Sequence, residues 1–429
     1  MLKKIMTFFL IAFLLILFTK FAGEKKPRYQ TNIRYSSPNW LSNERIICAK
    51  YIDHYKLYYG FLANISKGTA QLFKSETQIV SMNIDGTDEK IIKNIVMLIK
   101  SFGRTTSSEK YFIGDINDID YNPKRRLIAF RGLSGRLYLM NEDGTDLKKI
   151  AEQVGGSYFS PDGKFLQYTL NDKVWLYDLD SKERRVLNEN VRGGPWSPDG
   201  KWIYYILQGD HTNNFRNHLN IVNVKTGKKF IIEDAGSVNW SPINSKFTYT
   251  ISKKIEQGYA SSLYISKLTD DEIVNIDSIS NASGGVWNPE GDTILFRDNA
   301  DNKIYSLNCN TKEKKMVFQP SPENFHLSDA YRLKKEPEVE KIYPRCWIIS
   351  DRVIIESDER IYDDAKTKHS VLVVDVNTSS VVFRYILEDY ISNVLLSPDG
   401  KSLLFYDGAK LKVIIENGTR VVELIKRET

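Results

Sequence analysis

One pentapeptide, SPDGK, occurs three times in this chain and constrains its fold more than any other feature. The three copies begin at Ser160, Ser197 and Ser397. Looser copies, WSPINSK and WNPEGDT, begin at Trp240 and Trp287. Proline fixes φ at the first turn position and Asp-Gly completes the turn, so each copy predicts a tight turn. A turn that recurs with apolar strands around it predicts a chain built from repeated units.

An aromatic residue or a leucine stands immediately before each turn, and an apolar strand follows the turn. This register recurs eight times, with the reference residues Trp40, Tyr121, Phe159, Trp196, Trp240, Trp287, Trp347 and Leu396. Five of the seven tryptophans occupy this one position, and we expect them to pack between neighbouring units. The copies at Trp40 and Trp347 lack the Ser-Pro turn and fit the register by alignment only.

Each copy continues with a further strand, a polar turn and a last strand, as in the motifs MNIDGT (82–87) and MNEDGT (140–145). Four strands per copy, a to d, predict an all-β fold, a β-propeller of four-stranded antiparallel blades. Eight copies predict eight blades, or seven if one weak copy is a distorted insertion. The last copy supplies its own fourth strand through Arg420–Ile425, and Thr31–Tyr35 is a candidate strand for closing the ring.

The SPDGK turns and the MNxDGT motifs resemble the repeats of the TolB-type, WD-repeat-like propeller families. The resemblance covers nearly all of Gln30 to Ile425. It implies a propeller but no single function, because such repeats occur in periplasmic scaffolds, sugar-active enzymes and the cap domains of peptidases. TolB itself carries an α/β domain before its propeller, which this sequence does not show, so the role of TolB is not implied.

The first residues combine two lysines with an apolar run from Ile5 to Phe18, which predicts an N-terminal hydrophobic helix. The run fits an uncleaved membrane anchor or a cleaved secretory signal, and a buried core segment is the remaining alternative. No cysteine stands directly after it, which argues against a lipoprotein anchor. We therefore divide the chain into a signal or anchor with a short linker, residues 1–28, and a single exported, extracytoplasmic or periplasmic propeller, residues 29–429.

The remaining composition gives little sign of catalysis. Sixty basic and 54 acidic residues leave a net charge of +6, which indicates a mixed surface rather than a nucleic-acid binder. Cys48, Cys309 and Cys346 show neither a disulfide nor a zinc spacing. The chain has no G-x-S-x-G, Walker-type or HExxH motif, and most aspartates of the repeats stand in turns. We predict no catalytic residue, no cofactor and no metal ligand.

Long insertions at 52–78, 97–116, 207–218, 253–261, 319–342 and 357–369 fall between strands b and c or between blades, so the register predicts that they share one face. They hold all five histidines together with many aromatic and arginine residues, which favour recognition. The candidate binding face consists of His54, Tyr58, Tyr59, His211, Phe215, Arg216, His218, Tyr259, Phe325, His326, Tyr331, Arg332 and His369.

These features favour a non-enzymatic binding module that recognises a protein or a cell-envelope glycan through its loop-rich face. The alternative is a carbohydrate-active lyase or hydrolase with a site at the central channel. A third interpretation is a sensor or assembly factor that the N-terminal segment tethers to the membrane. The sequence contains no signal for the oligomeric state.

Overall fold

The computed structural model describes residues 28–58, 69–101, 104–107, 116–132, 135–189, 194–207, 218–255, 258–320, 338–361, 366–388, 391–407 and 410–424. Within these ranges the chain is almost entirely β-strand, arranged as eight antiparallel sheets in chain order. The all-β prediction and the eight blades are confirmed. The expected N-terminal helix at 5–18 lies outside the described residues. No helix among the described residues is long and apolar enough to cross a membrane.

Blades 1 to 4 occupy the N-terminal half of the chain. Blade 1 contains β1 (Arg28–Trp40), β2 (Arg45–Tyr58), β3 (Thr69–Asn83), β4 (Lys90–Ser101) and β5 (Arg104–Ser107). Blade 2 contains β6 (Ile116–Asn122), β7 (Leu127–Gly132), β8 (Leu137–Asn141) and β9 (Lys148–Ala151). Blade 3 contains β10 (Val154–Phe159), β11 (Phe165–Leu170), β12 (Lys173–Asp178) and β13 (Arg184–Glu189). Blade 4 contains β14 (Trp202–Leu207), β15 (His218–Asn223) and β16 (Lys229–Glu233).

Blades 5 to 8 follow the same plan. Blade 5 contains β17 (Ala235–Trp240), β18 (Lys246–Ile255), β19 (Gly258–Leu268) and β20 (Ile273–Ile279). Blade 6 contains β21 (Ala282–Trp287), β22 (Thr293–Asp298), β23 (Lys303–Asn308) and β24 (Lys314–Phe318). Blade 7 contains β25 (Glu338–Ile348), β26 (Arg352–Ile361), β27 (Lys366–Asp375) and β28 (Ser380–Ile386). Blade 8 contains β29 (Ile391–Leu396), β30 (Leu403–Asp407), β31 (Lys410–Ile415) and β32 (Arg420–Glu423), with a 3-10 turn at Glu416–Gly418.

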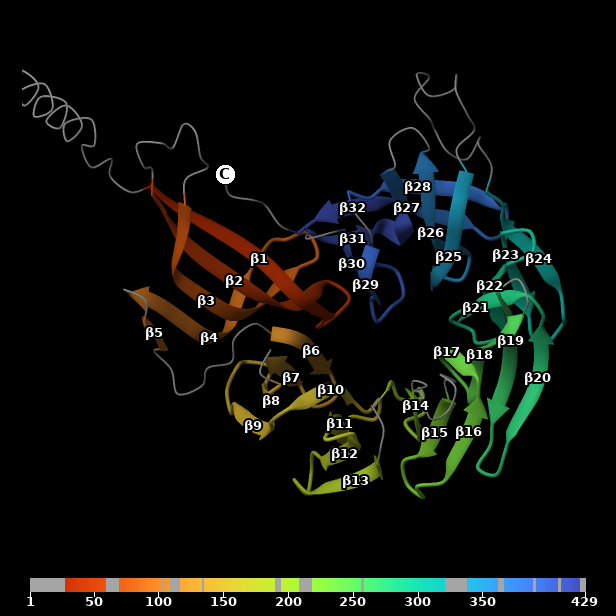
Figure 1. Cartoon of the computed structure of the whole chain (residues 1–429), viewed down its shortest axis with the longest axis horizontal. Coiled ribbons are helices and arrows are strands. Elements are labelled where there is room, and N and C mark those ends of the chain that lie inside the picture. The colour runs from red at the N-terminus through yellow and green to blue at the C-terminus, as the bar shows by residue number, and fades with distance from the viewer. Residues whose placement is uncertain are drawn as a thin grey trace, which may run out of the picture.

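The eight blades form a ring in which the first strand of each blade lies nearest the axis (Figure 1). The first strands of neighbouring blades contact one another, β1 with β6, β6 with β10, β21 with β25 and β25 with β29. The pairing of β1 with β2 shifts register between Ser36 and Asn39, and a comparable shift recurs in the first pairing of six further blades. Such bulges add local twist and bend a strand. The bend lets the first strand of a blade contact the first strands of the neighbouring blades.

The hydrophobic core is divided among the seams between blades. One cluster joins Ile47 and Ile79 of blade 1 to Ile128 and Phe130 of blade 2, and clusters of the same kind occupy the other seams. The ring closes in the same way, because Trp40, Ile46 and Cys48 pack against Leu404 and Val413 of blade 8. Thr31–Tyr35 belongs to β1 and pairs with β2, so it is the inner strand of blade 1 and does not complete blade 8.

Two blades depart from the predicted four strands. Blade 1 carries β5 as a fifth strand, paired with β4, so 97–116 is not one loop. In blade 4 the described part of the first strand, from residue 194 on, pairs only through a bridge between Trp196 and Ile203. Pro195 has no N–H to donate to a ladder, which explains the loss of pairing there.

Several other predicted loops are extensions of β-hairpins. The second strands of blades 1, 5 and 7 run to Tyr58, Ile255 and Ile361, and they pair with third strands of similar length. Their β-branched and aromatic residues fit a pleated ladder better than an irregular loop. His54, Tyr58, Tyr259 and His369 therefore lie on strands rather than on loops.

Candidate functional site

The repeated Ser-Pro-Asp-Gly turn is built by a fixed set of hydrogen bonds. In blade 3, Ser160 Oγ donates to Asp162 Oδ1 at 2.6 Å and accepts from the backbone N of Phe165 at 2.9 Å. Asp162 Oδ1 also accepts from the backbone N of Lys164 at 3.0 Å. The same Ser–Asp contact recurs in the turns that begin at Ser197 and Ser397. The turn aspartates thus have the structural role expected from the sequence.

The glycine of the turn between the third and fourth strands of blade 2, in the motif MNEDGT (140–145), allows blades 1 and 2 to approach closely. Gly144 has φ +80°, and a Cβ there would lie 2.2 Å from the carbonyl oxygen of Ile92 in blade 1. No side chain fits at that distance. The Asp-Gly pair therefore serves both the turn and the seam between blades 1 and 2.

The tryptophans of the register do pack between blades, as the sequence predicts, and three of them add a regular hydrogen bond. Trp287 Nε1 donates to the carbonyl oxygen of Asn239, Trp347 Nε1 to that of Val286, and Trp40 Nε1 to that of Leu395, each at 3.1 Å. In each case the acceptor immediately precedes the register residue of the preceding blade. Each indole therefore joins the inner strands of two neighbouring blades.

The same inner strands form a pocket of about 800 Å³, here called the channel pocket, at the end of the ring where the Ser-Pro-Asp-Gly turns lie. Blades 4 to 8 contribute to it. Its aromatic and apolar lining consists of Pro195, Tyr204, Val238, Trp240, Pro242, Val286, Trp287, Pro289, Cys346, Trp347, Ile349, Leu396 and Pro398. Its size is within the range of small-ligand pockets. Its lining is mostly apolar, although Trp287 and Trp347 are only 6% and 4% exposed and lie mainly in the seams.

The polar groups of the channel pocket gather at the turn of blade 8 and beside it. Asp399 is held within its turn by Ser397 and by the backbone N of Lys401. Ser350 donates to Glu290 at 2.6 Å. Lys401 is exposed and has no carboxylate partner within the described ranges. The pocket therefore has apolar walls and one exposed cation at its rim.

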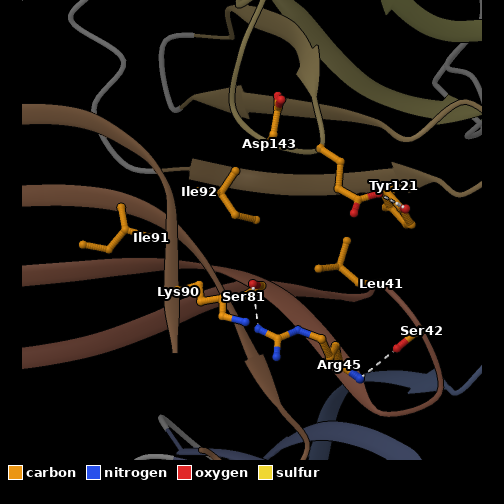
Figure 2. A pocket seen from close by; sticks show the side chains of 10 residues that line it. Leu41, Ser42, Arg45, Ser81, Lys90, Ile91, Ile92, Tyr121 and Asp143 are labelled. Carbon is orange, nitrogen blue, oxygen red and sulfur yellow. Dashed lines mark hydrogen bonds between the residues drawn. The ribbon is translucent and has the colours of Figure 1, made fainter. Parts of the chain in front are cut away.

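A smaller crevice of about 390 Å³ lies between blades 1 and 2 (Figure 2). Leu41, Ile92 and Tyr121 surround it, while Arg45 lies at its blade 1 side (Figure 2). The guanidinium of Arg45 donates to Asn83 at 2.7 Å and to Asp88 at 2.8 Å. Hydrogen bonds from Lys90 and Arg45 lower the pKa of Asp88. Because Arg45 is already paired, this crevice offers little attraction for an anionic ligand.

On the other side of the ring, neighbouring inner strands are joined through a carboxylate, that of Asp120, instead of an indole. Asp120 in β6 accepts from the backbone N of Phe159 in blade 3 at 2.8 Å and from Asn39 Nδ2 in blade 1 at 3.3 Å. It also accepts from the backbone N of Tyr121 at 2.9 Å. Burial raises the pKa of Asp120 to about 6 although these donors oppose the shift. Asp120 thus joins three consecutive blades.

The predicted binding-face residues are only partly described. His54, Tyr58, His218, Tyr259 and His369 lie toward the b–c ends of blades 1, 4, 5 and 7, as the register predicts. These five residues belong to four different blades. The other candidates, Tyr59, His211, Phe215, Arg216, Phe325, His326, Tyr331 and Arg332, lie outside the described residues.

Two of these histidines have polar neighbours within their own blades. His54 Nδ1 lies 3.0 Å from Thr31 Oγ1, and its Nε2 lies 3.6 Å from Glu76 Oε1. His218 begins β15, opposite Leu207 and Glu233. Over the described ranges, no group of three histidine, cysteine or acidic side chains is arranged to hold a metal ion. The three cysteines are free thiols, as their spacing suggests.

No protein-family model and no curated protein matches the chain. Among solved structures, it is similar to the tricorn protease, with 12% identity and a TM-score of 0.45 over 88% of this chain and 48% of that one. It therefore spans about half the length of that protein. It is also similar to an oligogalacturonate lyase from Vibrio parahaemolyticus, with 13% identity and a TM-score of 0.46 over 92% of this chain and 100% of that one.

A eukaryotic initiation factor matches with 13% identity and a TM-score of 0.43, over 78% of this chain and 93% of that one. At these identities and TM-scores the similarities carry nothing about activity, substrate or metal. The propeller rests on the sheet topology described above, and membership of the TolB-type repeat family stays a prediction.

Sequence reasoning placed the register tryptophans correctly but assigned them only a packing role. It did not identify the channel pocket, to which Trp240, Trp287 and Trp347 contribute surface. The motifs alone did not mark the pocket, because the WSP motif at Trp196 continues into Pro198, which does not line it, whereas the one at Trp240 continues into Pro242, which does.

Proposed function

We propose that this protein is a binding module that recognises an extended, proline-containing segment of a partner protein in the channel pocket. The observation that carries the proposal is the convergence of three tryptophans and four prolines from five blades around about 800 Å³. Aromatic-lined grooves are the usual receptors for polyproline-type segments, whose rings stack on indoles.

The hydrogen-bonding capacity of the pocket supports the same occupant. The carbonyls of Asn239 and Val286, which line it, already accept from Trp287 and Trp347. An ordinary peptide would bury N–H groups here with few acceptors left, and each unpaired group costs free energy. A proline-containing segment has fewer N–H groups, so it fits such a pocket with a smaller penalty.

The rigid ring also favours this function. The strands that position the pocket are held by core clusters at the seams, so little ordering should accompany binding. The proposal includes export of the propeller by residues 5–18, whose lysine-flanked apolar run is typical of a signal or anchor. The loop-rich face stays a second proposed contact surface.

A peptide selection tests the proposal. The full-length chain is immobilised and random peptides displayed on phage are selected against it, in parallel with two variants. Leu396→Asp places a carboxylate in the pocket at a side chain that is 37% exposed, and Ile243→Asp removes a 66% exposed apolar side chain outside the pocket lining. We expect proline-containing peptides that bind Leu396→Asp about tenfold or more weakly, because burying a charge is costly, and Ile243→Asp normally.

Selected peptides that lack proline, or that bind both variants as tightly as the wild type, would contradict the proposal. The carbohydrate-active alternative has one supporting observation, the raised pKa of Asp120. Two of its three hydrogen-bond donors, Asn39 and Phe159, come from the neighbouring blades, so a structural role accounts for that carboxyl group.

A further inference from the structure

The inner edge of blade 3 carries a third pocket, of about 420 Å³, and most of its lining residues lie at the end of the blade away from its Ser-Pro-Asp-Gly turn. Its lining consists of Gln153, Gly155, Gly156, Tyr158, Thr169, Asn171 and Asp172. Gln153 precedes β10, Gly155 and Gly156 lie near its start and Tyr158 near its end, and the other residues come from the end of β11 and the turn between β11 and β12. It is here called the blade 3 pocket.

The aromatic side chain of this pocket is unusually exposed. Tyr158 precedes the register residue Phe159, and it is 40% exposed to solvent. At the same position the other blades have Asn39, Asp120, Pro195, Asn239, Val286, Cys346 and Leu395. Blade 3 is thus the one blade that presents an aromatic ring at this position of the inner strand. A tyrosine there offers a flat apolar face together with a hydroxyl group.

Two glycines keep the space beside that ring open. Neither Gly155 nor Gly156 has a positive φ, so the backbone does not require glycine at these positions. A Cβ at Gly156 would meet nothing within 4 Å, and one at Gly155 would make only ordinary contacts with Thr169, the nearest at 3.8 Å. The fold would therefore accept side chains here. What the glycines provide is an unobstructed inner strand in front of the pocket.

Hydrogen-bonding groups lie at the rim. Asn171 and Asp172 form the two-residue turn between β11 and β12, with φ values of 52° and 53°, and both are exposed. Gln153 is exposed on the other side of the pocket. Within the described ranges, the side chains of these three residues have no hydrogen-bond or ion-pair partner. Together they offer two amides and one carboxylate, which can donate to and accept from hydroxyl groups.

We propose that the blade 3 pocket binds a neutral saccharide. The C–H face of a pyranose ring would stack on Tyr158, and its hydroxyl groups would bond to Asn171, Asp172 and Gln153. The lining contains one carboxylate and neither lysine nor arginine, so an acidic sugar would be repelled rather than attracted. The site does not rest on the partner segment proposed for the channel pocket, since the two pockets share no residue.

The test is a binding measurement on the full-length protein with three neutral disaccharides, maltose, cellobiose and diacetylchitobiose, and with digalacturonate for comparison. Titration calorimetry and saturation-transfer NMR would read out binding up to about 10 mM sugar, the weak range expected for a small open site. We expect at least one neutral disaccharide to bind and digalacturonate not to bind. Failure of all three neutral sugars, or preference for digalacturonate, would overturn the proposal.

Matched variants locate the site. Gly156→Leu fills the blade 3 pocket, and Gly236→Leu makes the same change on the inner strand of blade 5, where a Cβ also meets nothing within 4 Å. We expect the first to weaken sugar binding about tenfold or more and the second to leave it unchanged. Wild-type affinity in Gly156→Leu would place the sugar elsewhere.

A second pair of variants guards against a folding defect. Tyr158→Ala removes the ring and should lose binding, whereas Tyr158→Phe keeps the stacking face and should retain most of it. Undiminished binding by Tyr158→Ala contradicts the proposal. Loss of sugar binding should leave selection of peptides by the channel pocket intact, so the two proposals can fail separately.

Discussion

The inner ring joins its blades by two different chemistries, and the contrast divides the molecule into two arcs. In the tryptophan arc, indole N–H groups of Trp40, Trp287 and Trp347 donate to backbone carbonyls of the preceding blades. In the polar arc, Asp120 accepts a backbone N–H from blade 3, and Asn39 donates to the carbonyl of Ile119 at 3.1 Å. In both arcs a hydrogen bond joins the inner strands of neighbouring blades. The donor is an indole N–H in the tryptophan arc, whereas a carboxylate and a side-chain amide make the bonds in the polar arc.

The difference between the two arcs underlies our proposal that the two pockets bind different kinds of ligand. The tryptophan arc leaves an apolar pocket whose carbonyls are already used, which suits a segment poor in N–H groups. The polar arc ends at blade 3, where Tyr158 stands beside exposed amides and a carboxylate, which suits hydroxyl groups. One scaffold thereby offers two surfaces of opposite character.

The largest effect should come from removing an indole of the tryptophan arc. Trp287 is 6% exposed and fills the seam between blades 5 and 6. Trp287→Ala should lower the free energy of unfolding by about 3–5 kcal/mol, because it leaves a cavity and an unpaired carbonyl at Asn239. Urea unfolding followed by circular dichroism would measure it. A loss of less than about 1 kcal/mol in the free energy of unfolding would show that the tryptophan arc does not depend on the Trp287 side chain.

A buried ion pair tests the seam between blades 7 and 8 within the tryptophan arc. Lys412 and Asp407 are 2% and 0% exposed, lie 2.6 Å apart and contact Tyr385 of blade 7. Lys412→Met should cost about 3–5 kcal/mol, because it removes the cation that lies against the buried Asp407 carboxylate. Lys412→Met with Asp407→Leu should recover most of that loss. Equal destabilisation by the single and double variants would refute an electrostatic origin.

Asp120 should give the polar arc a pH dependence of stability between pH about 4 and about 6. Because the pKa of Asp120 is raised to about 6, the unfolded chain ionises first as pH rises from about 4. Between these values the wild type should lose about 1–3 kcal/mol of stability relative to Asp120→Asn, with no further change above pH about 6. Unfolding in urea across this range measures the difference, and a difference independent of pH would contradict it.

The smallest effect concerns the thiols. Burial raises the pKa of Cys346 to about 12 and that of Cys309 to about 11, and it raises the pKa of Cys48 as well. All three should react with iodoacetamide far more slowly in the folded chain than in urea, because the thiolate is the nucleophile. Cys346, half-buried beside the channel pocket, should react before Cys48 at the closing seam. Mass spectrometry of tryptic peptides over time gives the order, and the reverse order would mean that the pocket is closed.

Much of the fold could be predicted from the sequence because the repeat marks the same point in every blade. Trp40 and Trp347, which lack the Ser-Pro turn, still stand at or next to the ends of inner strands. The reduced inner strand of blade 4 was missed although Pro195 signals it. The fifth strand of blade 1, RTTS, has no apolar alternation, and its pairing depends on the adjacent β4.

The candidate sites were less predictable for a physical reason. Whether Trp240 or Tyr158 is exposed depends on the curvature of the ring and on what neighbouring inner strands leave uncovered. The sequence does not distinguish Asp120 from the other acidic residues, because its hydrogen-bond donors in blades 1 and 3 are distant in the sequence. The histidines attracted attention because they cluster in insertions, yet the described ones lie on different blades.

The central claim is that the channel pocket, rather than the opposite face, receives the partner segment. Hydrogen–deuterium exchange of the full-length protein with and without its tightest selected peptide tests this most directly. The account predicts slower exchange at the ends of β17, β21 and β25 and in the turn after Leu396, with no change at the β11–β12 turn. Protection confined to the b–c ends of the blades would contradict it and would move binding to the loop-rich face.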